Sequence, residues 1–173
     1  MNSIEEALAE FGNGPDKLQA AITDLSDVDF DQVIETAGWT IREIIHHLAE
    51  ADTRQIVSTR IAILSCGHSF EFSWHPGNRS MAGVLDYANL PILPSLGLFR
   101  ANREHFSTML KSVLNNSPSV WDYYLIAKNS PEDEGTKVTV GEWITGMANH
   151  LQEHLIEIKE IREALAGNSP LNS

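Results

Sequence analysis

The sequence predicts an all-α protein, a four-helix bundle in which residues 1–173 form one domain. Three observations lead to this prediction. Long stretches of the chain repeat apolar residues at helical spacing. Two of these stretches open with a capping-box motif, which marks the start of a helix. No segment reads as a convincing strand, so a bundle of helices is the expected architecture.

The first helix is predicted in two pieces. Asn2 to Phe11 has helical spacing and is followed by the sequence Gly-Asn-Gly. Pro15 then opens a second piece that runs to about Leu25, because a proline in the first turn removes an N–H group that would have no helical partner. The acidic segment from residue 26 to 38 is expected to be a loop with one turn of helix.

The second helix is expected to begin sharply. Thr40 is the predicted N-cap, and Glu43 follows three residues later to complete a capping box. Helical spacing continues to about Leu64, before a Cys-Gly pair ends the helix. The apolar positions that carry this pattern are Ile41, Ile44, Ile45, Leu48, Ile56 and Ile63.

Residues 68–94 lack a clean period and are expected to form a long connection, with a short helix near Met81 to Tyr87. Long ordered loops in compact domains often carry function. The third helix is predicted at residues 95–113, and a polar connection follows at 115–137.

The fourth helix opens with a second capping box, formed by Thr139 and Glu142, and is predicted to end near Ala166 with Gly167 after it. Because of this cap, the Val-Thr-Val sequence at 138–140 is interpreted as a helix start and not as a strand.

Composition narrows the classes of function. The net charge of −12 argues against binding to nucleic acids or to anionic membranes. One cysteine excludes an internal disulfide and a cysteine-based zinc site, so a metal site would need His, Asp or Glu. The first residues do not resemble a signal peptide, and no apolar run has the roughly 20 residues of a membrane span. We therefore expect a cytoplasmic protein.

Two histidines occupy the apolar side of the fourth helix. With 100° per residue and Trp143 at zero, His150 falls near ~340° and His154 near ~20°, within the apolar stripe. A spacing of four residues places both rings on neighbouring turns, where both can bind one ion. A divalent metal would satisfy two buried imidazoles. The alternative is a pair of core histidines hydrogen-bonded to nearby carbonyl or carboxylate groups.

The second helix offers a third ligand. His46 and His47 are adjacent, so only one can face the core. His47 lies at the edge of the apolar stripe, whereas His46 is expected to point to solvent or to an opposite surface. Asp52 lies inside the stripe, which is unusual for a carboxylate. It is expected either to handle protons beside a metal, or to pair with a buried arginine or a backbone donor.

The segments at residues 38–52, 85–106 and 139–163 resemble the DinB/YfiT superfamily of metal-binding four-helix bundles. One histidine before Leu-Ala on the second helix and an HxxxH motif on the fourth helix carry this resemblance. It implies an up-down-down-up topology, a homodimer, and a metal ion held by His47, His150 and His154. The family pattern often has a histidine where this chain has Asp52.

The resemblance implies a metal-dependent enzyme, either a hydrolase or a transferase that uses a low-molecular-weight thiol. Three protein ligands leave a position open for water or substrate, and histidine sites accept zinc, nickel, iron or manganese. The sequence leaves open a non-catalytic bundle, stapled by a metal or metal-free, that dimerises. Trp74 could line a substrate pocket or anchor the loop. His75 could act as an acid–base group or lie at the surface.

Overall fold

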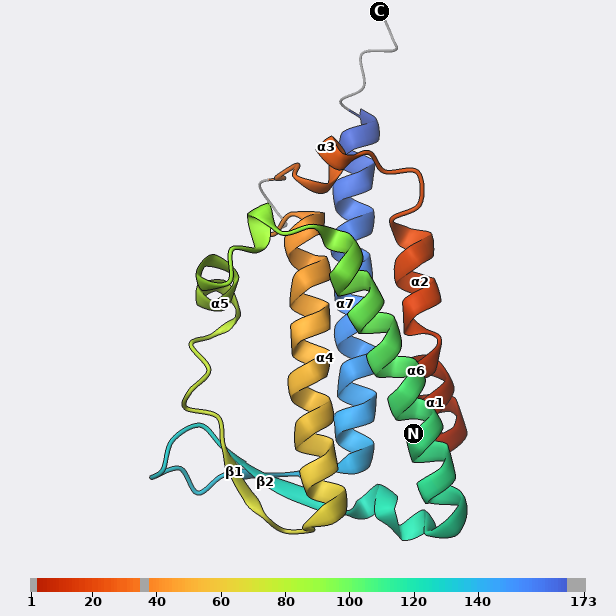
Figure 1. Cartoon of the computed structure of the whole chain (residues 1–173), viewed down its shortest axis with the longest axis vertical. Helices are drawn as coiled ribbons and strands as arrows, with labels where there is room; N and C mark the ends of the chain where they lie inside the picture. Colours follow the sequence, from red (N-terminus) through yellow and green to blue (C-terminus); the bar gives the residue numbers. More distant parts are fainter. Residues whose placement is uncertain (1–2, 35–37, 168–173) are drawn as a thin grey trace, which may run out of the picture.

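The computed structural model describes residues 3–34 and 38–167. Its main body is a four-helix bundle (Figure 1). The first position is shared by two short helices that run upward, α1 (Ile4–Gly12) and α2 (Gly14–Ala21). The helices α4 (Ile41–Leu64) and α6 (Ile92–Asn116) both run downward, and α7 (Val140–Gly167) returns upward. The predicted up-down-down-up topology is therefore confirmed.

Capping boxes fix the starts of the two helices that matter most for the site. At α4, the Glu43 N–H donates to Thr40 Oγ1 at 3.1 Å, and the Thr40 N–H donates to a Glu43 carboxylate oxygen at 2.9 Å. At α7, the Glu142 N–H donates to Thr139 Oγ1 at 3.1 Å, and the Thr139 N–H donates to a Glu142 carboxylate oxygen at 2.7 Å. Each box satisfies N–H groups that have no partner inside the helix.

A small sheet at the lower end of the bundle corrects the prediction of a strand-free chain. It contains β1 (Ser69–Glu71), β2 (Tyr124–Lys128) and β3 (Thr136–Thr139) in that spatial order. β1 pairs parallel to β2, and β2 pairs antiparallel to β3. The interpretation of residues 138–140 was wrong in part, because β3 ends at the same threonine that caps α7.

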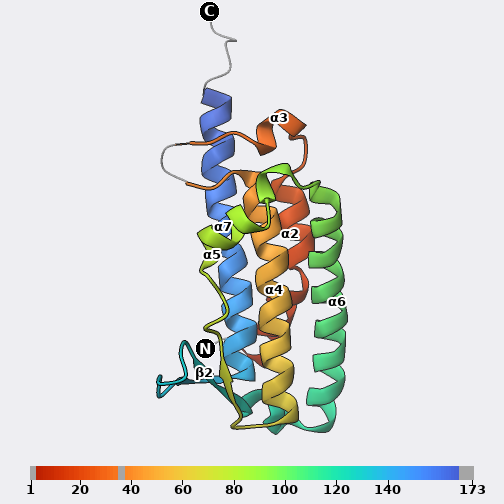
Figure 2. The same ribbon diagram turned by 60° about the vertical axis from the view of Figure 1, so that its left-hand side comes forward.

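The connections place a second layer of chain beside α4. After β1, the chain climbs past α5 (Asn78–Val84) and the 3-10 helix η1 (Tyr87–Asn89) before α6 begins (Figures 1 and 2). The predicted short helix in this connection is thus present. Two shorter elements complete the fold: the single turn α3 (Asp27–Phe30) and the 3-10 helix η2 (Pro118–Asp122).

The apolar core consists of two clusters stacked along the bundle. The lower cluster, nearer the sheet, contains Phe11, Phe106 and Met147, whereas the upper cluster contains Phe99 and Leu151. The buried polar residues Asp52, on α4, and Arg103, on α6, lie between them. Among the described residues, no helix combines the length and the apolar character needed to cross a membrane.

Candidate metal centre

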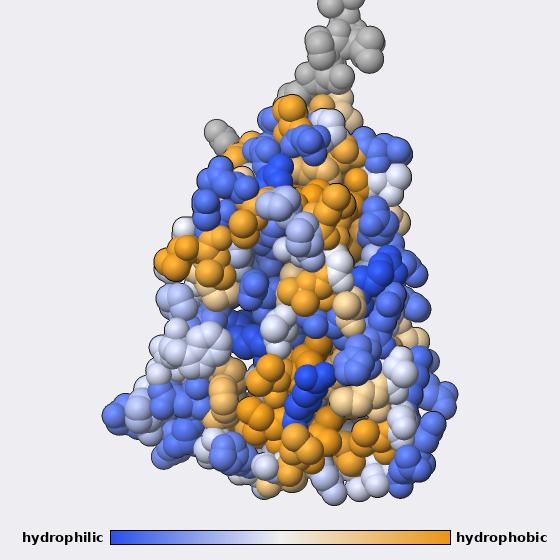
Figure 3. All heavy atoms as spheres, in the orientation of Figure 1, coloured by the Kyte–Doolittle hydropathy of each residue, from blue (hydrophilic) through white to orange (hydrophobic). Residues whose placement is uncertain are grey.

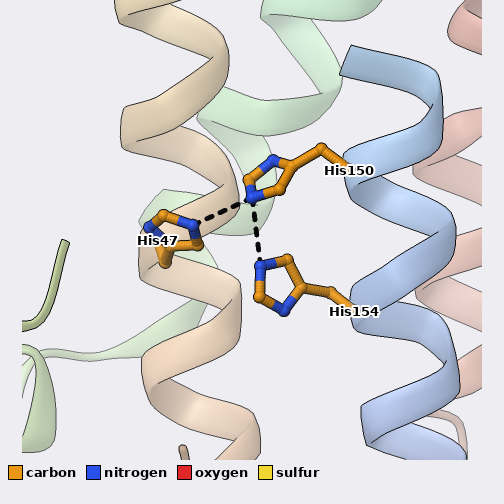
Figure 4. A group of neighbouring side chains, drawn as sticks. All are labelled: His47, His150 and His154. Atoms are coloured by element: carbon orange, nitrogen blue, oxygen red, sulfur yellow. Dashed lines mark hydrogen bonds between the residues drawn. The ribbon is translucent and has the colours of Figure 1, made fainter. Parts of the chain in front are cut away.

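Three histidines from two helices meet between α4 and α7 (Figure 4). His47 comes from α4, and His150 and His154 come from successive turns of α7. The Nε2 atom of His150 lies 3.0 Å from Nε2 of His47 and 3.1 Å from Nε2 of His154. One potential ligand atom from each residue lies within 4.8 Å of the others. The structure thus brings together the three residues that the sequence predicts as ligands.

Hydrogen bonds alone do not satisfy this arrangement. Each nitrogen of a neutral imidazole carries in the ring plane either one hydrogen or one lone pair. The Nε2 atom of His150 can therefore form one in-plane hydrogen bond, although two neighbouring nitrogens lie within reach. Both neighbours nevertheless lie at contact distance. Two nitrogens bound to the same tetrahedral zinc, each at 2.0–2.1 Å, are about 3.3 Å apart. The spacing and the chemistry of the donor set therefore fit a single divalent cation.

The outer nitrogens of the rings differ in their partners. His154 Nδ1 donates to Glu157 Oε2 at 2.8 Å, which leaves the lone pair on Nε2 and directs it toward the other two rings. The Nδ1 atoms of His47 and His150 are buried without a partner among the described residues. Trp39 stacks on the His47 ring with centroids 5.2 Å apart and shields it from solvent.

The environment of His47 and His150 keeps both rings neutral. Burial, reinforced by His150 and His154, lowers the pKa of His47 to about 3. Burial and the neighbouring His154 lower the pKa of His150 to about 4. Both rings are therefore neutral at pH 7, and metal binding requires that form of imidazole.

The position of His46 differs from the sequence prediction. Its side chain is not at the surface but buried, with 1% of its area exposed. Its ring contacts Ser95 Oγ at 2.8 Å through Nδ1 and the Leu90 carbonyl at 3.2 Å through Nε2. The long connection folds over this face of α4, and the helical spacing of α4 alone gives no sign of that cover. His46 is therefore a satisfied structural histidine.

Asp52 lies outside the group of three histidines. Both of its oxygens accept hydrogen bonds from Arg103, at 2.6 and 3.1 Å, and both side chains are fully buried. Burial raises the pKa of the Asp52 carboxyl, and the guanidinium opposes that rise. Of the roles that the sequence leaves open for Asp52, the structure favours the partner of a buried arginine.

The remaining predicted residues lie in the long connection. Trp74 is 60% exposed and packs edge-on against His75. His75 lines a cavity beside α4 that also contains Arg54. Sequence reasoning missed Arg54 and the two supports of the histidines, Trp39 and Glu157. The spacing of three residues between His154 and Glu157 was the available signal for one of them.

Several proteins similar to this chain are described as metal-dependent. A protein of Oceanobacillus iheyensis named "putative metal-dependent hydrolase" is 26% identical over 158 residues, which cover 91% of this chain and 85% of that protein. A Bacillus mycoides protein with the same description is 24% identical over 162 residues, covering 94% and 87%. The metal-dependent relatives and the three histidines together support a divalent metal.

A solved structure shares the fold. YfiT from Bacillus subtilis, described as "a probable metal-dependent hydrolase with an unusual four-helix bundle topology", superposes with a TM-score of 0.80. The match covers 96% of this chain and 91% of YfiT at 16% sequence identity. The sequence itself matches the family model of the DinB superfamily over residues 10–158. The chain therefore belongs to the DinB superfamily.

Proposed function

We propose that this protein is a metal-dependent hydrolase of small molecules, in which His47, His150 and His154 hold one divalent cation. The observation that carries the proposal is the convergence of three Nε2 atoms at distances that hydrogen bonding cannot satisfy. The descriptions of the relatives from Oceanobacillus and Bacillus support the same activity.

The donor set narrows the choice of metal. Imidazole nitrogens suit zinc and nickel best, and they also accept iron and manganese. Three protein ligands leave at least one position open, as in catalytic sites. A divalent ion bound here would supply Lewis acidity, which lowers the pKa of water and polarises a carbonyl group of the substrate.

The side chains around the ligands would prepare them for this task. Glu157 holds the proton of His154 on Nδ1, so Nε2 presents its lone pair. Trp39 covers one face of His47 and limits the access of water to that ring. The low pKa values of His47 and His150 keep both rings available as neutral ligands at pH 7. Asp52, engaged with Arg103, has no part in this proposal.

Transfer of a low-molecular-weight thiol is the second reaction implied by the family resemblance. It would use the same three ligands, and it differs from hydrolysis only in the group that attacks the substrate. A single assay can therefore separate the two reactions from each other and from a bundle without turnover.

The test uses protein that has been stripped with a chelator and reloaded with zinc, nickel, manganese or ferrous iron. We expect metal-dependent hydrolysis of activated esters or amides, lost in His150→Ala and retained in His105→Ala, a variant of an exposed histidine. Turnover only in the presence of an added thiol would replace hydrolysis by thiol transfer. Equal turnover in His150→Ala and wild type would exclude the three-histidine site as the source of activity.

A further inference from the structure

A cavity of about 450 Å³ lies beside α4, below the three histidines. Its wall includes Arg54 and Ser58 from α4, Trp143 from α7, and Phe72 and His75 from the long connection. Hydrophilic side chains gather in the hollow between α4 and the connection that carries α5 (Figure 3). The volume falls within the range of sites for small ligands, roughly 300–1,000 Å³.

Arg54 brings to this cavity a positive charge that forms no ion pair among the described residues. Its side chain is half-buried, and no carboxylate within the described residues lies within 4.0 Å to form an ion pair with it. Burial lowers the pKa of its guanidinium, while Tyr87 and the Glu50 carboxylate, one turn earlier on α4, oppose this shift from a longer distance. A partly desolvated and unpaired guanidinium is costly, and an anion in the cavity would relieve that cost.

Two further donors in the same wall lack acceptors. The Nδ1 atom of His75 accepts the Gly77 N–H at 3.2 Å, so in the neutral ring the hydrogen is on Nε2. That Nε2 is buried and has no partner among the described residues, and the same holds for Nε1–H of Trp143. Three residues of one cavity wall therefore each carry a donor that lacks the acceptor that buried donors normally have.

The cavity is placed to serve the metal centre. Arg54 follows His47 by seven residues on α4, and Trp143 precedes His150 by seven residues on α7. Seven residues correspond to two helical turns, or about 10 Å along each axis. Because the two helices run in opposite directions, both residues lie at the same end of the site, toward the sheet.

We propose that this cavity binds a carboxylate group of the substrate, with Arg54 as the charged anchor and Trp143 and His75 as hydrogen-bond donors. The proposal extends the hydrolase function proposed above, and it rests on that function in treating the bound ligand as the substrate. A planar guanidinium with one charge matches a carboxylate in geometry and charge. Phe72 and Trp143 offer apolar surface to the body of the ligand, so the substrate class is a small organic acid with an apolar or aromatic portion.

Benzoate is a suitable probe because it combines a carboxylate with an aromatic ring. Benzoate is titrated into the whole chain, once metal-loaded and once chelator-treated, and binding is followed by calorimetry and by NMR. The indole N–H resonance of Trp143 is identified by its absence from the spectrum of Trp143→Phe. We expect saturable binding in both metal states and a displaced Trp143 resonance. Arg54→Gln should weaken binding at least tenfold, while Arg60→Gln, an exposed arginine on the same helix, should change it less than twofold.

The controls separate this proposal from the proposed function. Benzamide, which lacks the charge, should bind at least tenfold more weakly than benzoate, and inorganic phosphate should bind more weakly than benzoate. Benzoate binding in His150→Ala would support the carboxylate site even if that variant and wild type both lack metal. Binding that requires the metal, binding unchanged in Arg54→Gln, or no saturable binding of benzoate would each overturn the proposal.

Discussion

Two groups of polar side chains lie inside the bundle, and they are built differently. One is the pair of Arg103 and Asp52, and the other is the group of three histidines. Both stand where a helical bundle normally has aliphatic side chains. Both cross between helices, since Arg103 comes from α6 and Asp52 from α4.

The arginine–aspartate pair is closed. Arg103 donates to both oxygens of Asp52, to the Met147 carbonyl at 2.8 Å and to the Phe11 carbonyl at 3.3 Å. Its guanidinium also lies 4.4 Å from the centre of the Phe99 ring. The two charges neutralise each other, and the guanidinium donates to acceptors inside the protein, so the pair offers no free charge to a ligand.

The three histidines are open by the same criterion. The Nε2 atom of His150 lies at hydrogen-bond distance from the Nε2 atoms of both His47 and His154, but it can form only one in-plane hydrogen bond. The Nδ1 atom of His154, in contrast, has a hydrogen-bond partner in Glu157. Burial of a side chain therefore does not distinguish a structural group from a binding group. The balance of donors and acceptors does, and the predictions below test that distinction.

The largest effect is expected where the closed pair is broken. Arg103→Met leaves Asp52 buried without its counter-charge, and removal of one partner of a buried pair costs about 3 to 5 kcal/mol of unfolding free energy. Denaturant unfolding measures the loss. Arg100→Met, three residues away in an exposed ion pair, is the matched control and should leave stability nearly unchanged. Equal behaviour of both variants would contradict a structural role for the closed pair.

A divalent metal should stabilise the folded protein through the three histidines and not through the pair of Arg103 and Asp52. A divalent ion at 100 times its dissociation constant adds about 2.7 kcal/mol to the unfolding free energy of a protein that binds it only when folded. We expect a corresponding rise in the melting temperature of wild type and Arg100→Met on addition of zinc or nickel. His150→Ala should show no such rise, and a rise equal to that of wild type would place the metal elsewhere.

Glu157 should tune the metal affinity through His154. Loss of a carboxylate that holds the outer nitrogen of a metal-bound histidine typically weakens binding ten- to hundredfold, or about 1.4 to 2.7 kcal/mol. Glu157→Ala should show this loss in a competition titration with a coloured chelator. Glu153→Ala, an exposed carboxylate one turn earlier on α7, should bind metal as wild type does. An unchanged affinity in both variants would remove Glu157 from the site.

The most gradual effect concerns the pH dependence of the metal-free protein, because it is spread over more than two pH units. The pKa of His150 is about 4 in the folded state, and the unfolded value is 6.5, so the unfolded chain binds more protons between these limits. The unfolding free energy should therefore decrease by up to about 1.4 kcal/mol per pH unit, because of this histidine, as the pH falls from 6.5 toward 4. His150→Gln should show a slope shallower by that amount in denaturant unfolding. Parallel slopes would contradict a buried neutral His150.

The sequence predicted those parts of the fold that depend on neighbouring residues. The capping boxes at Thr40 and Thr139 marked two helix starts, because the motif and its contacts span only three residues. The sheet was missed because its pairing joins distant segments, such as Ser69 with Ile126. A short, mostly polar strand carries little periodicity by which to find it.

The difference between local and long-range contacts also explains which residues of the site were predicted correctly. Helical angles placed His150 and His154 on one side of α7, and the structure brings both to His47. His46 was misplaced because its cover, Ser95 and Leu90, lies more than 40 residues away in sequence. The partner of Asp52 and the cavity around Arg54 likewise depend on contacts between elements, which no local pattern records.

Elemental analysis of untagged protein, purified without exposure to a nickel column, tests the central claim most directly. We predict about one divalent ion per chain in wild type and in His105→Ala, and none in His150→Ala. Retention of a full equivalent in His150→Ala would contradict the assignment of ligands. Wild-type protein that takes up no ion, even when zinc, nickel or manganese is supplied, would make the three histidines a core network and the protein a non-catalytic bundle.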